Sequence, residues 1–440
     1  MYKSGIILSF LLLIVFIKGE AQKKDYAYYD SLTYKLYVDK DYKQLIKTGK
    51  EALHSGLDYY YLRMRIGIAL YYQAKYRAAV PHFEKALSFY DNDIVREYLY
   101  YASLWGGDRL KALKVTDDMS EALKKKLGIK ERDIMGTGVE LAFLNQAEDF
   151  PDEFDFPVDQ GEGEQVVPTR FYSLAWDISH RVGKNASFTH MLTYLHKNND
   201  KYSFVDNQDF YDTDFNTDQF QYFFSSTVSL GHSWNMIIGG QASAVSIPVY
   251  EQFTDYMSRM MPGQYVLTTT WNYDYALSAS LLKNFSRGSL EAEFAMAYIN
   301  SSVSYQPSGI LRIYPFANFK LYTQSQFGYL IKDDDGKFFQ QQKIGFKVAK
   351  HLWLEADYFS GSISGFTLNN GALLFNGQEE VDRMVGGRLI IPGGSKFTMT
   401  LGYQNRLQSN YFIPFDDVNA KSNKLELNYS LIFILLSWTL

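Results

Sequence analysis

The segment from Tyr265 to Leu282 alternates between bulky apolar side chains and small or polar ones. Every second residue from Tyr265 is aromatic or aliphatic apart from one threonine, and the interleaved residues from Thr268 are small or polar. A period of two predicts a β-strand with one dry face and one wet face. Strands of soluble domains usually stop after about 5 to 6 residues. This run is roughly three times longer than that, so an unusual sheet is indicated.

The same alternation recurs along the chain after residue 133, as in Leu290–Tyr298 and Lys396–Gln404. It marks 14 candidate strands, near 135–147, 168–182, 186–199, 217–230, 233–248, 265–283, 287–302, 307–315, 317–331, 338–349, 351–360, 381–391, 396–408 and 423–438. Short turns alternate with long connections, and the long ones include 148–167, 200–216, 249–264, 361–380 and 409–422. We expect the long connections to face outward as loops.

An even number of long amphipathic strands with this rhythm of connections predicts an all-β transmembrane antiparallel barrel of about 14 strands. In such a barrel we expect Trp271, Tyr273 and Leu277 to face lipid. We expect Asn272, Asp274 and Ser278 to face a polar lumen. A soluble β-sandwich is the alternative, but it rarely sets acidic side chains opposite such bulky faces.

Two segments nearer the N-terminus, Lys40–Leu53 and Ala74–Leu87, match each other at an offset of 34 residues. The small and aromatic positions of the pattern are Tyr42, Ala52, Gly67, Tyr76, Ala79, Phe83 and Ala86. A period of 34 resembles the tetratricopeptide repeat, and the resemblance implies a small all-α domain of stacked helix pairs. The pattern is degenerate, because Arg63 and Asp91 stand where the family prefers Trp and Pro. The domain is either a partner-binding solenoid or a structural spacer.

The first residues have the composition of a secretory signal peptide. Lys3 precedes an apolar run at Ile6–Ile17, and Gly19 and Ala21 have the small size that a cleavage site requires. The run is too short to cross a bilayer comfortably, although an uncleaved anchor is the alternative. We therefore divide the chain into a signal peptide (1–21), periplasmic tetratricopeptide-like helical repeats (22–132) and an outer-membrane β-barrel (133–440). The expected location is the outer membrane of a Gram-negative-type cell.

Charged side chains of both signs fall on the predicted lumen face. The candidates are Asp177, Asp274, Glu291, Glu293, Arg312, Lys320, Lys343, Lys347, Glu355, Asp357, Arg388 and Arg406. In a barrel of this size they either line a narrow water path or interlock as a plug. The sequence leaves both possibilities open.

Composition limits the chemistry. The chain has no cysteine, which excludes disulfides, thiolate metal sites, a cysteine nucleophile and a lipidated cysteine. Its seven histidines are scattered and fit no catalytic motif, so we predict no catalytic residue, no dedicated metal site and no enzyme. We expect no cofactor except Ca²⁺ at the acidic loops 148–164, 206–218 and 333–335, whose carboxylates suit a hard cation. A solvated acidic rim is the simpler interpretation of these loops.

A signal peptide, degenerate repeats and a C-terminal barrel together resemble the YaiO-like outer-membrane proteins. The combination is also similar to repeat-plus-porin exporters of exopolysaccharide. The hairpin Gly309–Tyr322 is typical of such barrels. The resemblance implies a channel, for polysaccharide or solute export, with outer-membrane lipid around it. Its helical domain, with a net charge of +6, would recruit a periplasmic protein or an acidic cargo such as a glycan or small solute, and no nucleic acid. The alternatives are a non-conducting scaffold of an envelope or secretion assembly and, less favoured, an outer-membrane enzyme.

Overall fold

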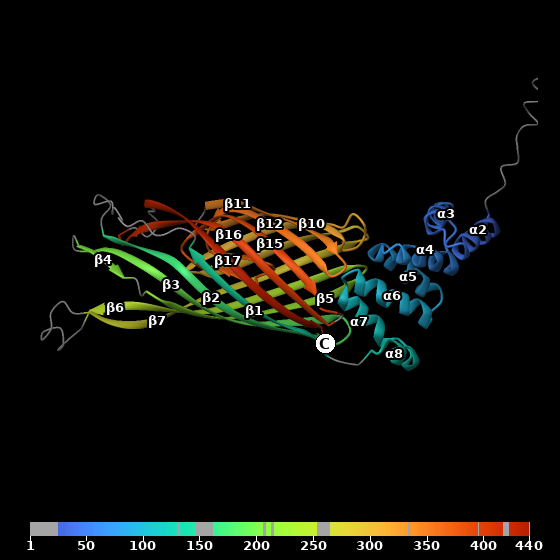
Figure 1. Ribbon diagram of the computed structural model, residues 1–440, viewed down its shortest axis with the longest axis horizontal. Coiled ribbons are helices and arrows are strands. Elements are labelled where there is room, and N and C mark those ends of the chain that lie inside the picture. The colour runs from blue at the N-terminus through green and yellow to red at the C-terminus, as the bar shows by residue number, and fades with distance from the viewer. Residues whose placement is uncertain are drawn as a thin grey trace, which may run out of the picture.

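The chain folds into a helical part followed by a barrel (Figure 1). The computed structural model describes residues 25–129, 133–146, 162–205, 208–212, 215–252, 265–332, 335–394, 396–416 and 422–439. Within these residues there are seven helices and then a closed antiparallel barrel of 14 strands. The predicted signal peptide lies outside the described residues.

The helices are α2 (Tyr26–Val38), α3 (Tyr42–His54), α4 (Tyr60–Tyr72), α5 (Tyr76–Phe89), α6 (Asp93–Trp105), α7 (Arg109–Asp117) and α8 (Glu121–Leu127). Successive helices from α2 to α7 pack against one another. Left-handed backbone at Lys40 (φ 57°), Ala74 (φ 55°) and Gly107 (φ 81°) comes just before α3, α5 and α7. The same turn therefore repeats at the spacing that the sequence pattern predicts. Among the described helices, none has the length and apolarity needed to cross a membrane.

The residues of the repeat pattern pack where helices cross. Ala52, Ala79, Phe83 and Ala86 are fully buried in one hydrophobic core. A Cβ atom at Gly67 would lie 2.6 Å from the Phe83 ring, so only glycine permits the close approach of α4 and α5. Tyr42 and Tyr76 are half-buried, and Tyr42 stacks on Tyr72 with ring centroids 5.5 Å apart. Membership of the tetratricopeptide family stays a prediction.

His82 on α5 makes the helical part sensitive to pH. Burial, reinforced by Arg63 and Lys50 and opposed by Asp58, lowers the pKa of His82 from 6.5 to about 4. The unfolded chain binds this proton below pH 6.5, whereas the folded chain binds it only near pH 4. The free energy of unfolding should therefore fall by up to about 3 kcal/mol as the pH drops through that window, with no such change above it. Urea titrations followed by tryptophan fluorescence should show the loss at low pH.

A matched pair of variants separates this effect from other titrations. His82→Gln should flatten the dependence of unfolding on pH between 6.5 and 4, whereas Lys47→Gln, at an exposed position of α3, should leave it unchanged. An identical slope in the wild type and His82→Gln would contradict the assignment.

The barrel strands follow the predicted set closely. They are β1 (Ile134–Gln146), β2 (Gly163–Val182), β3 (Ala186–Val205), β5 (Thr217–Gly231), β6 (Trp234–Gln252), β7 (Tyr265–Phe285), β8 (Gly288–Ile299), β9 (Ser302–Ile313), β10 (Leu321–Lys332), β11 (Asp335–Ala349), β12 (Leu352–Ile363), β15 (Glu380–Pro392), β16 (Phe397–Pro414) and β17 (Ser422–Thr439). Each pairs antiparallel with its neighbour in sequence, and β1 closes the barrel on β17, with Gly138 opposite Ser437. The short strand β4 (Gln208–Asp212) extends the β3 side.

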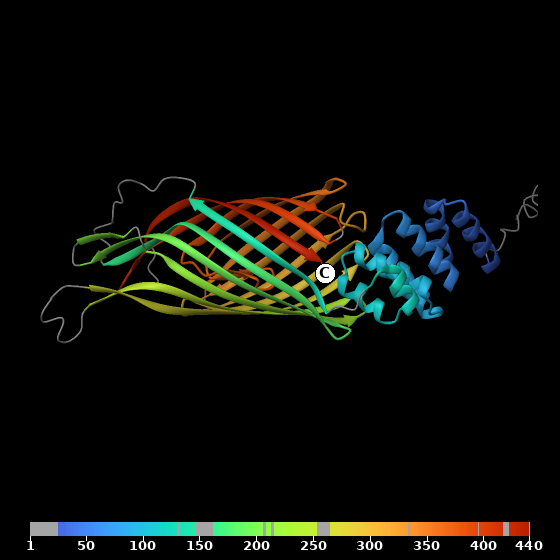
Figure 2. The same ribbon diagram turned by 60° about the horizontal axis from the view of Figure 1, so that its bottom comes forward.

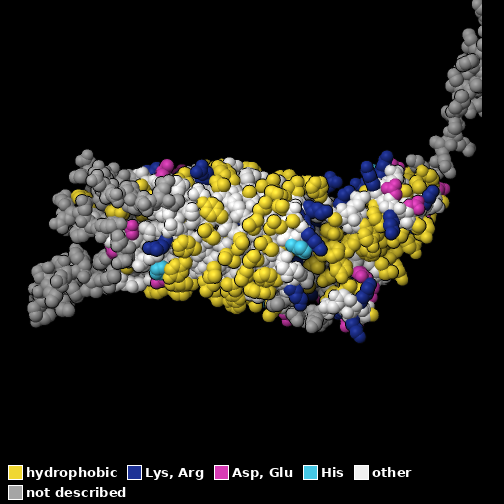
Figure 3. All heavy atoms as spheres, viewed as in Figure 1, with side chains coloured by type: hydrophobic (Ala, Val, Ile, Leu, Met, Phe, Trp, Pro, Cys, Tyr) yellow, Lys and Arg dark blue, Asp and Glu magenta, His cyan; other side chains and the backbone are white. Residues whose placement is uncertain are grey.

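The two faces of β7 meet the environments predicted for them. Trp271, Tyr273 and Leu277 are exposed on the outside of the barrel, whereas Asp274 and Ser278 are 2% and 5% exposed on the inside. Asn272 is also exposed, near the far end of the strand. Apolar side chains cover much of the visible barrel exterior (Figure 3). The alternation therefore separates an apolar exterior from a polar interior.

The prediction that 361–380 is an outward loop is wrong. Two short strands in it, β13 (Phe366–Leu368) and β14 (Leu373–Phe375), form a hairpin that folds into the barrel. We call residues 364–379 the inward loop. The reason is physical: Asn369, Asn370 and Gly371 all adopt positive φ and turn the chain sharply, and the apolar residues on either side need a core. The predicted bounds 287–302 and 307–315 are also wrong at their shared end, because β8 stops at Ile299 and β9 begins at Ser302 after a tight turn at Asn300–Ser301.

Candidate functional site: a divided lumen under a helical cap

Polar side chains of the barrel wall hold the inward loop by its backbone. Gln306 on β9 donates from Nε2 to the Thr367 carbonyl (2.7 Å) and accepts from the Thr367 N–H (3.2 Å). Ser278 on β7 donates to the carbonyl of Asn370 (2.7 Å). Each of these wall side chains is buried, so the loop satisfies polar groups that the closed barrel would otherwise leave without partners.

An aromatic stack anchors the other side of the inward loop. Phe339 on β11, Phe359 on β12, Phe366 and Phe375 follow one another with ring centroids 6.1, 5.5 and 4.4 Å apart. The first three rings are 0% exposed. Such pairs add roughly 0.5–1.5 kcal/mol each beyond the burial of their area. The inward loop is therefore a fixed part of the barrel interior.

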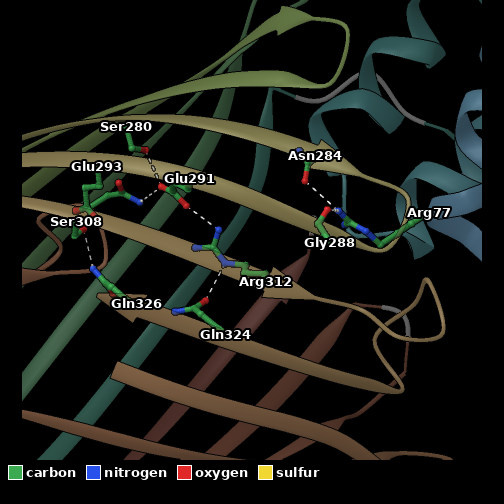
Figure 4. Close-up of polar contacts among 11 residues, drawn as sticks. Arg77, Ser280, Asn284, Gly288, Glu291, Glu293, Ser308, Arg312, Gln324 and Gln326 are labelled. Atoms are coloured by element: carbon green, nitrogen blue, oxygen red, sulfur yellow. Dashed lines mark hydrogen bonds and ion pairs between the residues drawn. The ribbon is translucent and has the colours of Figure 1, made fainter. Parts of the chain in front are cut away.

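A charged network connects this loop to the wall (Figure 4). Glu291, 1% exposed on β8, accepts from Arg312 Nη1 (2.7 Å), Ser280 Oγ (2.7 Å) and Asn370 Nδ2 (3.3 Å). Arg312 also donates from Nε to Gln324 (2.8 Å). The structure thus brings two of the predicted lumen charges into direct contact. A third, Glu293, lies beside them and accepts from Ser308 (3.4 Å).

A second group of predicted charges gathers farther around the wall. Arg388 on β15 lies 3.8 Å from both Glu355 and Asp357 on β12. Tyr322 donates to Glu355, and Lys343 is the cross-strand partner of Asp357. These residues interlock along the wall instead of crossing the lumen.

Three of the remaining predicted lumen residues contact side chains outside the predicted set. Asp274 accepts from Asn376 (2.7 Å) of the inward loop, and the Arg406 guanidinium lies over the Phe375 ring (5.6 Å). Asp177 on β2 lines a cavity between the wall and the inward loop. Lys347 lies over Trp353 (4.3 Å) near the helix-facing end. Lys320 is exposed in the turn before β10, outside the strand in which it was predicted.

The inward loop covers only part of the lumen. A cavity of about 360 Å³ remains between this loop and the wall of β1, β2, β3, β5, β16 and β17. Its lining mixes Glu140, Asp177, Gln219 and Arg406 with apolar side chains such as Phe171. We call this cavity the eyelet. The eyelet shows that side chains leave open space between the inward loop and this part of the barrel wall.

Arg77 on α5 fastens the helices to the barrel. In the β7–β8 hairpin its Nη2 donates to Asn284 Oδ1 (3.0 Å) and to the Gly288 carbonyl (3.3 Å), as Figure 4 shows. It also donates to the Phe285 carbonyl (3.4 Å). The guanidinium also lies 4.3 Å from the centre of the Tyr314 ring. One side chain therefore joins α5 to two hairpins of the barrel.

Further contacts close this end of the barrel. The Arg77 N–H donates to the Ala317 carbonyl (3.1 Å), and Asn318 Nδ2 donates to the Ala74 carbonyl (2.8 Å). On α7, Asp117 pairs with Arg181 near the end of β2 (Nη1–Oδ1 2.8 Å). Both ribbon views show the helices seated on one end of the barrel (Figures 1 and 2). We call α5 to α7 the helical cap.

A large cavity lies between this cap and the inward loop. It has a volume of about 1110 Å³ and is bounded by residues of α3 to α7 on one side. On the other side it reaches Glu291, Arg312 and Asn370 inside the barrel. We call it the vestibule. The tip of the inward loop separates it from the eyelet, because Asn370 lines the vestibule and Asn369 lines the eyelet.

Metal binding finds no support in the described residues. They contain no group of three or more His, Asp or Glu side chains arranged to hold an ion. The acidic segment 148–161 and parts of the other two acidic loops lie outside the described residues. The expectation of Ca²⁺ there stays a prediction, as does the expectation that the protein is not an enzyme.

Comparison with known proteins finds only a distant likeness to solved barrel structures. No protein-family model and no curated protein matches the sequence. Among solved structures, the Pseudomonas putida toluene transporter TodX has 8% identity and a TM-score of 0.41 over 71% of this chain and 90% of TodX. A Pseudomonas aeruginosa FadL homologue has 9% identity and a TM-score of 0.37 over 74% of this chain and 93% of its own. The KdgM porin has 8% identity and a TM-score of 0.26 over 68% and 97%. At these scores the likeness carries no argument about function.

Proposed function

We propose that this protein is an outer-membrane channel for small solutes, narrowed by its inward loop and closed at one end by its helical cap. The observation that carries the proposal is the pair of cavities, about 1110 and 360 Å³, that lie in series along the lumen. A barrel serving only as an anchor has no need of open chambers with polar walls. A cavity of about 360 Å³ suits a small solute better than a polymer, so we favour small solutes over polysaccharide.

The exterior supports a place in a membrane. The exposed apolar side chains of β7 run from Trp271 to Leu281, and a tilted strand needs roughly 9–11 residues to cross a bilayer. Lys283 lies over the Trp234 ring (4.8 Å) close to the helix-facing end, which suits a girdle at the lipid interface. Short turns lie at the periplasmic end of such barrels, so the helices would lie in the periplasm.

A scaffold is the second candidate function. The helical part exposes Tyr34 (57%), Tyr61 (60%) and Tyr90 (63%), and exposed aromatic residues are enriched at protein interfaces. These residues suit the recruitment of a periplasmic protein partner. In this alternative the barrel anchors the helices and passes nothing.

Swelling of liposomes in a graded series of neutral sugars tests the proposal. The wild type should admit only the smallest sugars, and slowly. Arg77→Ala should speed entry several-fold, because charge-assisted hydrogen bonds of the kind it loses contribute roughly 1.5–3 kcal/mol each. Lys47→Ala, at an exposed position of α3, is the matched control and should behave as wild type. Impermeability of the wild type and of Arg77→Ala would favour the scaffold.

A further inference from the structure

The vestibule is strongly basic. Seven Lys and Arg side chains line it against three Asp and Glu side chains. The three acids already have partners inside the cavity: Lys111 lies 2.8 Å from Glu84 and 4.0 Å from Asp108, and Arg312 lies 2.7 Å from Glu291. Five cations remain without a carboxylate partner among the described residues, namely Lys50, Lys75, Arg77, Arg109 and Arg287. The chamber therefore carries a surplus of positive charge.

The guanidinium groups of two of these cations, Arg77 and Arg109, are partly buried. Arg77 contacts only carbonyl oxygens, an amide oxygen and a ring, and its Nε is buried without a hydrogen-bond partner. Arg109 donates to the Met135 carbonyl. Burial lowers the pKa of both groups, and at Arg77 the nearby Asp108 opposes this effect without cancelling it. Charges in such places are normally paired, so the chamber lacks an anion.

Guanidinium groups bind carboxylate and phosphate through paired, charge-assisted hydrogen bonds. The buried hydroxyl of Ser103, also without a partner, lines the same chamber and can donate to an oxygen. A volume of about 1110 Å³ accommodates a small organic molecule together with water. We propose that the vestibule binds small solutes that carry two or more carboxylate or phosphate groups, with Arg77 and Arg109 as their charge partners.

The site has a consequence for the cap, which rests on the proposed channel function. An anion that pairs with Arg77 competes with the carbonyl oxygens of Phe285 and Gly288 for the same N–H groups. By linkage, a ligand that binds the loosened cap better shifts the cap toward that state. Binding of the transported anion would thus loosen the helical cap that closes the channel.

Calorimetric titration of the full-length protein in a non-ionic detergent tests the site without requiring conduction. The probes are inorganic pyrophosphate and citrate, with glycerol as the neutral comparison. We expect saturable binding of at least one anion, weakened by added salt. Arg109→Gln should lower the affinity about tenfold, which corresponds to the loss of about 1.4 kcal/mol. Lys47→Gln, outside the chamber, should change nothing.

A second variant guards against a folding defect. Arg287→Gln alters an exposed turn residue of the chamber and should also weaken binding. Binding of pyrophosphate alone would identify phosphate as the recognised group, whereas binding of both probes would include carboxylate. No binding of either anion, or affinities unchanged in both variants, would overturn the proposal. Binding by a protein that passes no sugar would instead keep the site and reject the channel.

Discussion

Deletion of residues 25–129 should raise the single-channel conductance several-fold. These residues hold every described contact that closes the helix-facing end, including Arg77 on the β7–β8 turn and Asp117 on Arg181. Without them the vestibule opens directly to solvent, and the helix-facing end no longer resists the flow of ions. The measurement is the conductance of the deleted and full-length proteins in planar bilayers under the same salt.

The deletion is informative only if the barrel remains closed. Closure depends on β1 pairing with β17, from Gly136↔Thr439 to Gln146↔Tyr429, and involves no helix. A heat-modifiable shift on gels should therefore persist in the deleted protein. A folded, deleted barrel with the conductance of the wild type would show that the helices do not limit passage.

Excision of the inward loop should give the second large effect. Replacing Phe366–Phe375 by a short Gly-Ser turn removes the partition between vestibule and eyelet. Conductance should rise several-fold, and larger sugars should enter liposomes. The wall side chains that lose their partners, Gln306 and Ser278, would then face water in a wider lumen.

A point variant tests the anchor of the inward loop at constant length. Phe366→Ala breaks the aromatic stack, and truncating a buried Phe costs roughly 3–5 kcal/mol. The loop should then leave the wall intermittently, seen as rapid steps between two conductance levels. Phe294→Ala removes an exposed ring from the outer face of β8 and should leave the recordings unchanged. Steady single-level conductance in Phe366→Ala would contradict the assigned anchor.

The sequence predicts the barrel well because the strand pattern is local. The alternation around Asp274 and Ser278 requires only a period of two and one polar side, and the structure follows it. The offset of 34 residues between Tyr42 and Tyr76 likewise corresponds to the start of two equivalent helices, α3 and α5.

The features that close the lumen could not be predicted in this way. Arg77 and Asn284 are separated by 207 residues. In the sequence, Arg77 looks like any arginine on the exposed face of a helix. The apolar residues of the inward loop form too short a run to show a period, so Phe366 gives no sign of packing on Phe359. Individual charges such as Glu291 and Arg312 were identifiable, but their pairing depends on strand register.

The most direct test uses the absence of cysteine from the chain. Asp117→Cys combined with Arg181→Cys places a unique thiol pair across the interface between the cap and the barrel, where a short, reducible bis-thiol linker can join α7 to the end of β2. The measurement is single-channel conductance before and after reduction of the linker, made with Arg77→Ala also present so that the linker takes over from that anchor, and with each single cysteine variant as the control. We predict low conductance while the linker is intact and a several-fold increase once it is reduced. Equal conductance in the linked and reduced states would contradict the claim that the helical cap closes a channel.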